Sequence, residues 1–378
     1  MPHIVIIGSG LAGYTLMKEL RKRDADLRVT LVTADGGSFY SKPNLSNALA
    51  NKREAAALAS ASAAKMADDH GATVLTHTRV TAVDSAGRRV TTTAGEIGYD
   101  RLVLALGADP IPHGLTGDGA EAVLTVNDLA DYAVFRDAIA GKRRVTVLGG
   151  GLIGCEFAND LAQAGYAVDV VHLGAWPLER LLPAEAGARL TEGLAALGVT
   201  WHFGRRAQSV VRERAGYAVT LDDGETLVAD VVLSAIGLKP RTSLAAAAGI
   251  DVGRGIKVDR MLATSAPGVY AIGDCAEVDG QVLPYVQPLM VQARALAATL
   301  SGDATPVVYP AMPVMVKTPA HPVAVLPPPI AAPGAWQVEC NDAGVCALNL
   351  DATGRLQGFA LTGAETARRS ALVRELAA

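Results

Sequence analysis

Two glycine-rich turns are the residues of this chain whose types and spacing most directly predict chemistry. Residues 8–13 read GSGLAG after the apolar run 4–7, and residues 149–154 read GGGLIG after the apolar run 145–148. Both fit the pattern G-x-G-x-x-G, whose glycines permit a tight turn, close approach of the backbone to a pyrophosphate, and close packing of strand on helix. The N-terminus of the following helix favours the anion. Two such turns predict two dinucleotides bound together, so that a hydride can pass between them.

Composition and charge are those of an ordinary globular protein. The 378 residues are enough for two or three domains, 50% are apolar, and the net charge is −4. This balance excludes a general attraction to nucleic acid or to anionic membranes. No run of 18 apolar residues is present, so no membrane span is expected. The chain enters a strand without a basic region or cleavage site, which predicts a cytoplasmic protein.

The elements that must position the turns form two strand-helix-strand units. The first is predicted at strand 3–7, helix 11–23 and strand 28–33, and the second begins at 143 and has its helix at 152–164. An alanine-rich stretch predicts a helix over 55–70. Further helices are predicted at 185–197, 288–300 and 364–376, and further strands at 101–105, 167–173, 208–221, 230–235, 337–340, 345–350 and 356–361. The last of these elements predict a small C-terminal α+β domain.

Four motifs occur in a fixed order along the chain. They are the first glycine turn, LALGA at 104–108, the second glycine turn, and YAIGD at 270–274. This order resembles the flavoprotein reductases of the glutathione-reductase and ferredoxin-reductase type, and the resemblance covers nearly the whole chain. It implies an α/β fold with two Rossmann-like dinucleotide-binding domains and a small C-terminal α+β domain. The implied boundaries are 1–111 with 241–310 for a discontinuous FAD domain, 112–240 for an inserted NAD domain, and 311–378 for the third domain.

Four segments are most similar to the rubredoxin-reducing branch of this family: 40–43, 151–161, 273–280 and 316–320. That similarity implies bound FAD, NADH as the electron donor and rubredoxin, an acidic iron protein, as the acceptor, with a role in alkane hydroxylation. The alternatives are a reductase for a ferredoxin or another small iron carrier, an NADH oxidase, and a flavin- and NAD-binding sensor without turnover. A monomer without a metal ion is expected.

The resemblance also assigns roles to residues. Ser9 to Ala12 should face the FAD pyrophosphate, Val80 should bond adenine through its backbone, and Asp274 should bind the ribityl-phosphate arm. Either Thr33, which ends the second strand, or Asp35, which lies 22 residues after Gly13, should hold the adenosine ribose, with Ala34 beside it. The helix near Val286 should point its positive N-terminus at the flavin. The residues predicted to bind the cofactors are Gly8, Ser9, Gly10, Leu11, Ala12, Gly13, Thr33, Ala34, Asp35, Lys42, Val80, Ala105, Gly149, Gly151, Leu152, Ile153, Gly154, Glu156, Gly237, Asp274, Val286 and Lys317.

Three charged residues are the predicted catalytic groups. Lys42 and Lys317 should each place a positive charge beside the isoalloxazine. Glu156, two residues after the second turn, should point toward the contact of nicotinamide and flavin; alternatively, it is a carboxylate that interacts with the dipole of its own helix. Lys42, Lys317, Lys52 and Arg53 are also candidates for a basic rim that attracts an acidic carrier.

The positions of the cysteines argue against electron transfer through thiols. No C-x-x-C occurs, and the loop after the first unit holds Ser41 and Ser46 but no cysteine, the first of which is Cys155. Electrons should therefore pass directly from flavin to acceptor. Cys155 and Cys275 read as small packing residues. Cys340 and Cys346 could approach one another, although unrelated thiols are favoured.

The sequence only weakly indicates whether NADH or NADPH is the preferred donor. An acidic residue is expected at the end of the second strand of the NAD unit, but His172 stands there, and the nearest arginine that could meet a 2′-phosphate is Arg180. NADH is favoured mainly by the resemblance.

Overall fold

The computed structural model describes residues 2–329 and 334–376. The chain divides into two compact units, each built from three separate segments. Unit 1 contains residues 1–42, 59–109 and 238–309, and unit 2 contains residues 43–58, 110–237 and 310–378. No helix of the described residues combines the length and the apolar character needed to cross a membrane.

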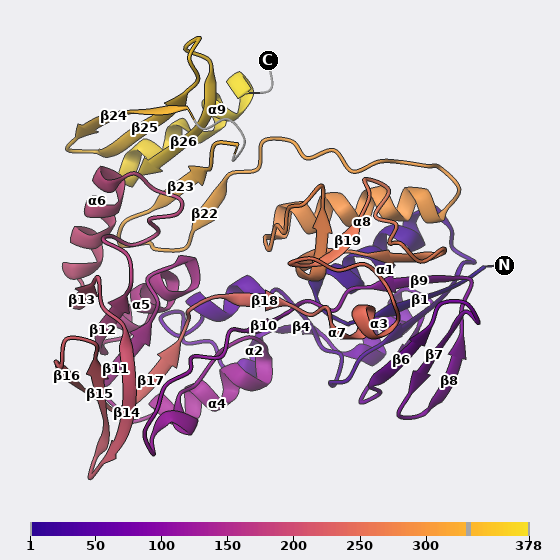
Figure 1. The fold of residues 1–378 in the computed structure, drawn as a ribbon, viewed down its shortest axis with the longest axis horizontal. Coiled ribbons are helices and arrows are strands. Elements are labelled where there is room, and N and C mark those ends of the chain that lie inside the picture. Colours follow the sequence, from indigo (N-terminus) through magenta and orange to yellow (C-terminus); the bar gives the residue numbers. More distant parts are fainter. Residues whose placement is uncertain (1, 330–333, 377–378) are drawn as a thin grey trace. The chain divides into compact units, whose positions relative to one another are not determined.

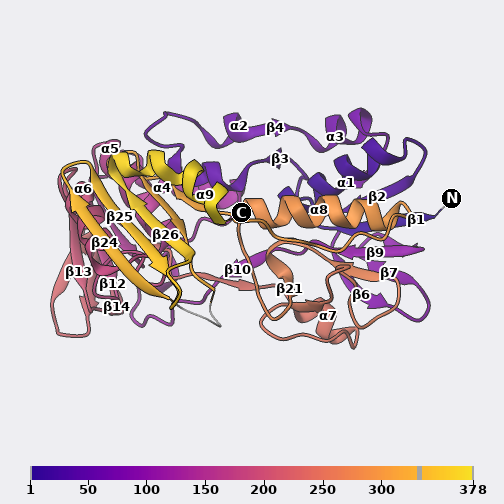
Figure 2. The same ribbon diagram turned by 90° about the horizontal axis from the view of Figure 1, so that it is seen from above.

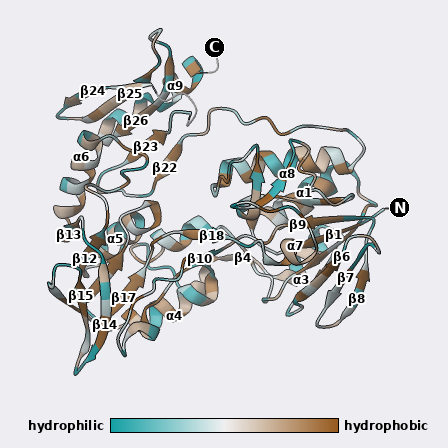
Figure 3. Cartoon of the chain, in the orientation of Figure 1, coloured by the Kyte–Doolittle hydropathy of each residue, from teal (hydrophilic) through white to brown (hydrophobic). Residues whose placement is uncertain are grey.

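Unit 1 is built on a parallel sheet whose strands follow the order β20-β9-β1-β2-β5. The strands are β1 (His3–Ile7), β2 (Arg28–Val32), β5 (Thr73–Leu75), β9 (Arg101–Leu104) and β20 (Val269–Ala271). All five residues of β1 are buried, as expected for a central parallel strand covered on both faces, and Figure 3 shows its apolar character. Helices α1 (Leu11–Arg23) and α8 (Val286–Leu300) run side by side (Figures 1 and 2).

Smaller elements complete unit 1. An antiparallel meander is formed by β6 (Val80–Asp84), β7 (Arg89–Thr92) and β8 (Gly95–Gly98), and β19 (Ile256–Val258) pairs in parallel with β21 (Ala276–Val278). The remaining elements are β3 (Phe39–Tyr40), the 3-10 helix η1 (Lys42–Asn47) at the unit boundary, β4 (Ala59–Ala61), α3 (Ala63–Asp69), β10 (Ala108–Pro110), β18 (Leu238–Pro240), α7 (Ser243–Ala247) and the 3-10 helix η3 (Gly273–Cys275).

Unit 2 contains a second parallel sheet, in the order β13-β12-β11-β17. Its strands are β11 (Arg144–Leu148), β12 (Ala167–His172), β13 (Val199–Phe203) and β17 (Val231–Ser234), and its helices are α2 (Ala55–Leu58), α4 (Leu129–Ile139), α5 (Leu152–Gln163) and α6 (Ala184–Ala195). Beside it lies an antiparallel meander of β14 (Ala207–Glu213), β15 (Gly216–Leu221) and β16 (Thr226–Ala229). Residues 222–224 form the β15–β16 turn, as the sequence DDG predicts.

The C-terminal part of unit 2 is an antiparallel sheet in the order β22-β23-β26-β25-β24. Its strands are β22 (Val314–Val316), β23 (Val323–Leu326), β24 (Ala335–Asn341), β25 (Gly344–Leu350) and β26 (Leu356–Thr362), followed by the 3-10 helix η4 (Gly363–Arg368) and α9 (Arg369–Leu376). This sheet has its own apolar cluster around Phe359 and Leu361, and α6 packs against β25 and β26. The predicted α/β class with a small C-terminal α+β region is confirmed.

Two predicted helices differ from the structure. The helix expected over 55–70 is interrupted, because β4 pairs with β3 and α3 begins separately after Ser62, whose hydroxyl accepts the amide of Lys65. The helix expected over 364–376 begins as the 3-10 helix η4 and becomes α-helical only at Arg369. Helical periodicity is present in both segments, but strand pairing and capping decide where the helices begin.

Candidate functional site

The first glycine turn leaves the N-terminus of α1 open. Gly8 has φ +115°, and a Cβ there would lie 2.2 Å from the carbonyl oxygen of Ala105, while one at Gly13 would lie 2.0 Å from that of Gly8. Gly10 is the N-cap, without a side-chain cap, and a Cβ at this position would meet nothing within 4 Å. The first amides of α1 therefore face a space without side chains, which fits a pyrophosphate.

The structure links both residues that the sequence proposed for the adenosine ribose. Asp35 Oδ1 accepts the hydroxyl of Thr33 at 2.7 Å, the hydroxyl of Ser9 at 3.1 Å and the amide of Gly37 at 2.8 Å. The Ser9 hydroxyl also donates to Thr33 at 2.8 Å. The choice between Thr33 and Asp35 is therefore not exclusive, since one network fixes both beside the turn.

Asp274 lies in η3 directly after β20, beside the start of α1. Burial raises the pKa of this carboxyl, and the charge of Lys42 opposes the shift. The preceding Gly273 amide donates to the buried Gln292 of α8 at 2.7 Å, and a Cβ at Gly273 would lie 2.8 Å from that of Ala12. This packing brings Asp274 and the first turn together, as predicted. A partly buried carboxylate of this kind is stabilised by hydrogen-bond donors, and a ribityl chain carries hydroxyl groups.

The other residues predicted for the flavin lie in unit 1, with the exception of Lys317 in unit 2. Val80 begins β6, Ala105 follows β9 and approaches Gly8, and Val286 is the first residue of α8. Gln292 was not predicted. The sequence signal that could have identified Gln292 is a polar residue between apolar neighbours of α8, and its side chain is buried in the structure.

The second glycine turn repeats the geometry of the first within unit 2. Gly149 has φ +106°, a Cβ at Gly154 would lie 1.8 Å from the carbonyl oxygen of Gly149, and Gly151 is an N-cap with open space beside it. The turn is followed by α5, and Gly237, also predicted, lies in unit 2 at the boundary before β18. This turn can receive a second pyrophosphate.

Glu156 and Lys317 form a buried ion pair in unit 2, although 161 residues separate them. Glu156 is 0% exposed, and its Oε2 lies 2.5 Å from the ammonium of Lys317 and 2.5 Å from the hydroxyl of Ser46. Its Oε1 accepts the backbone amide of Lys317 at 3.0 Å. The carboxylate is therefore paired with Lys317 and Ser46, and because it lies near the start of α5 the alternative, an interaction with the dipole of its own helix, stays a prediction. Because the charge of Lys317 is paired, this residue does not contribute a free charge to a basic rim.

Two further polar residues of α5 hold other parts of unit 2. The carboxylate of Asp160 accepts the amides of Leu49 and Ala50, each at 2.9 Å. The side chain of Asn159 accepts the amide of Ala320 at 3.2 Å. No role in the site was predicted for Ser46, Asn159 or Asp160. A signal was available, since polar residues at 156, 159 and 160 share one face of an otherwise apolar helix.

All four cysteines are free. Cys155 and Cys275 are buried, and burial raises the pKa of both thiols, that of Cys275 to about 11. Cys340 and Cys346 lie on the neighbouring strands β24 and β25, with Cys340 exposed and Cys346 buried. Across residues 2–329 and 334–376, no three His, Cys, Asp or Glu side chains gather as a metal ion would require.

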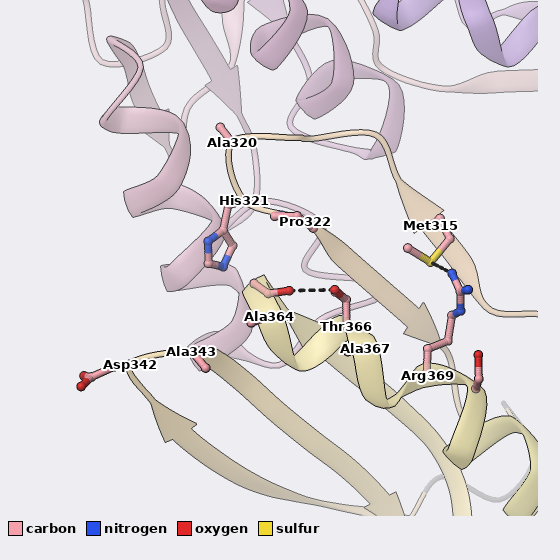
Figure 4. Close-up of a pocket in the computed structure, with 12 residues that line it drawn as sticks. Met315, Ala320, His321, Pro322, Asp342, Ala343, Ala364, Thr366, Ala367 and Arg369 are labelled. Carbon is pink, nitrogen blue, oxygen red and sulfur yellow. Dashed lines mark hydrogen bonds between the residues drawn. The ribbon is translucent and has the colours of Figure 1, made fainter.

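The C-terminal sheet carries a pocket of approximately 680 Å³ that the sequence did not indicate. Figure 4 shows it between the 320–322 turn, η4 and the start of α9, with the guanidinium of Arg369 against the sulfur of Met315 at 2.8 Å. The side chain of His321 also lines it.

Residues 2–297 match the family model of pyridine nucleotide-disulphide oxidoreductases, and residues 306–376 match the model of a rubredoxin binding C-terminal domain. The chain belongs to the pyridine nucleotide-disulphide oxidoreductase family, which confirms the predicted resemblance.

Several proteins are similar to this chain along nearly its full length. A rubredoxin-NAD(+) reductase of Alcanivorax borkumensis is 48% identical, with 100% of this chain and 99% of that protein covered. A rubredoxin-NAD(+) reductase of Acinetobacter baylyi is 44% identical (98% and 96% covered), and a nitric oxide reductase FlRd-NAD(+) reductase of Aeromonas salmonicida is 41% identical (99% and 96% covered). The solved ferredoxin reductase for the CYP199A2 system of Rhodopseudomonas palustris has a TM-score of 0.89 at 28% identity, with 98% of this chain and 93% of that chain covered.

Proposed function

We propose that this protein takes a hydride from NADH onto bound FAD and passes electrons singly to rubredoxin. The observation that carries the proposal is the rubredoxin binding domain at 306–376, on a chain whose whole length aligns with rubredoxin-NAD(+) reductases. The use of NADH rather than NADPH and a supply of electrons to alkane hydroxylation are parts of the proposal that rest on the sequence resemblance. The cytoplasmic location and the monomeric state, also part of the proposal, rest on the N-terminal sequence and on the short C-terminal segment.

Both dinucleotides fit the described residues. The open N-terminus of α1 and the partly buried carboxyl of Asp274 would hold the pyrophosphate and ribityl chain of FAD, and the turn at 149–154 would hold NADH. When bound, the flavin supplies the conversion of a two-electron donor into single electrons. The protein supplies position, because hydride transfer requires the reacting atoms to be about 3–3.5 Å apart.

Lys42, Glu156 and Lys317 remain the proposed catalytic groups, with Ser46 added. The pair Glu156–Lys317 is held by the Ser46 hydroxyl and carries no net charge, and it therefore presents a dipole instead of a free cation. Lys42 supplies a positive charge near Asp274 in unit 1. Their proposed task is to orient the nicotinamide and to support negative charge on the reduced cofactor.

A variant without the two buried thiols tests whether electrons bypass cysteine. We expect Cys155→Ala/Cys275→Ala to reduce rubredoxin within about twofold of the wild-type rate, since buried thiols with a raised pKa are not thiolates at neutral pH. Steady-state reduction of rubredoxin by NADH measures this. A loss of carrier reduction in a variant that keeps its FAD absorbance would contradict direct transfer.

The acceptor is tested by comparing rubredoxin with ferredoxin at equal concentration. We expect rubredoxin to be reduced faster, on the order of tenfold, and we expect its rate to fall as salt rises. Lys52 and Arg53 are the remaining candidates for the rim in unit 2. Their alanine variants should flatten the salt profile while hydride transfer from NADH, followed by flavin bleaching, stays unchanged.

Two other results would redirect the assignment. Equal rates with both carriers would reject rubredoxin as the specific acceptor, and rapid NADH consumption with oxygen alone would favour an oxidase. Two of the relatives are named nitric oxide reductase FlRd-NAD(+) reductase. Their name favours FlRd, the carrier of a nitric oxide reductase, as a second candidate acceptor.

A further inference from the structure

The acid expected at the end of β12 is replaced by a histidine that belongs to the glycine turn. Nδ1 of His172 accepts the amide of Gly150 at 3.1 Å, and a Cβ at Gly150 would lie 2.8 Å from Cγ of the ring. Burial lowers the pKa of His172. With Nδ1 as an acceptor, the proton of the neutral ring is on Nε2, so the ring cannot accept hydrogen bonds from two ribose hydroxyls.

The loop after β12 returns to the same turn and brings a carboxylate with it. The amide of Leu178 donates to the carbonyl of Gly150 at 2.9 Å, and Leu178 is buried with φ +58°, a conformation that leucine rarely adopts. Gly150 is thus bonded on one side by His172 and on the other by Leu178. This arrangement fixes the next residue, Glu179, close to the end of β12.

Glu179 itself folds back over the strand end. Its Oε2 accepts the amide of Ala175 at 3.2 Å, and a Cβ at Gly174 would lie 2.3 Å from the carboxylate. The carboxylate also acts on His172, where it opposes the effect of burial on the ring's pKa. Glu179 is exposed, so its oxygens remain accessible to a ligand at the turn.

We infer that Glu179, and not residue 172, accepts the hydroxyls of the adenosine ribose of NADH and excludes NADPH. A carboxylate accepts bonds from a diol, whereas the 2′-phosphate of NADPH would bring a second negative charge beside it. His172 positions this site by fixing the turn. The inference rests on the proposed function, because it assumes that the turn at 149–154 binds NADH.

The test uses the full-length FAD-loaded protein and its Glu179→Gln variant, with ferricyanide as the acceptor so that carrier specificity has no influence. We expect kcat/KM for NADH to fall about 10–100-fold through KM, the loss typical of a hydrogen bond to a charged group. We expect kcat to stay within about twofold and NADPH to be used as well as before or better. Glu185→Gln, an exposed acid on α6, is the matched control and should behave as wild type.

Calorimetric titration of the oxidised protein with NAD⁺ and NADP⁺ provides a readout independent of turnover. Glu179→Gln and Glu179→Ala should both lose the discrimination between the two, while their FAD absorbance and Tm remain at wild-type values. A wild-type protein that prefers NADP⁺ would overturn the NADH assignment itself. A wild-type preference for NAD⁺ that both variants retain would overturn only the role of Glu179.

Discussion

Lys317→Met should destabilise the protein by about 3 kcal/mol, because it leaves the fully buried carboxylate of Glu156 without its cation. The lower end of the range for buried pairs applies, since the lysine side chain is 27% exposed. Removing both partners should recover much of the loss, so Glu156→Gln/Lys317→Met is expected to be more stable than Lys317→Met alone. Denaturant unfolding of the wild type, of the single variants Glu156→Gln and Lys317→Met, and of the double variant forms a double-mutant cycle. The cycle measures the coupling free energy between the two residues.

The matched control is an exposed ion pair. Lys65 and Asp69 lie 2.9 Å apart in α3 with side chains 62% and 46% exposed, and Lys65→Met should cost no more than about 0.5 kcal/mol. Equal losses for Lys65→Met and Lys317→Met would show that burial does not strengthen the pair. Slow flavin bleaching by NADH in the double variant, despite its recovered stability, would separate a catalytic role from a structural one.

Asp274→Asn should weaken FAD binding about 10–100-fold and, in the protein stripped of flavin, should increase stability at neutral pH. Burial raises the pKa of Asp274 in the folded state. The folded protein therefore holds this proton more tightly than the unfolded chain, and the contribution to stability is lost as pH rises from the ordinary range of aspartate through the raised pKa. Asparagine carries no charge, so the variant does not lose this stability as pH rises. Its amide oxygen is, however, a weaker acceptor than a carboxylate for a ribityl hydroxyl.

Fluorescence titration with FAD measures the first effect, and thermal unfolding of the flavin-free protein, followed as pH rises from the ordinary range of aspartate to neutrality, measures the second. The control is Asp303→Asn, an exposed residue of unit 1 in a 3.8 Å pair with Arg23, which should change neither. An Asp274→Asn protein that keeps full FAD affinity would contradict the proposed ribityl contact.

Local sequence pattern predicted the parts of this site that depend on neighbouring residues. The two glycine turns could be located because strand, turn and helix follow one another within a few residues, and Asp274 because it follows a buried strand. Glu156 and Lys317 were each identified, but their pairing was not, because the fold brings together segments that no periodicity connects. The hydroxyl of Ser46 was missed for the same reason.

The NAD unit shows a different limit of sequence reasoning. The general pattern places the carboxylate at the end of the second strand, where this chain has His172. Glu179 comes from seven residues later, through a reversal held by the left-handed backbone of Leu178. Leucine gives no sequence signal for that conformation, so this acid could be found only in the structure. The predicted domain boundaries at 112, 241 and 311 remain proposals.

The polar face of α5 has a consequence for exchanging domains between reductases. Glu156 and Asn159 of α5 bond Lys317 and Ala320, which both lie within residues 306–376, the region that matches the rubredoxin binding domain. A chimera joined near residue 306 would therefore inherit one half of a buried charge pair from each parent. Parents should combine into a stable protein where these two positions match, as a carboxylate with an amine or as two neutral residues, so the two positions limit which carrier-binding regions can be grafted onto a given reductase.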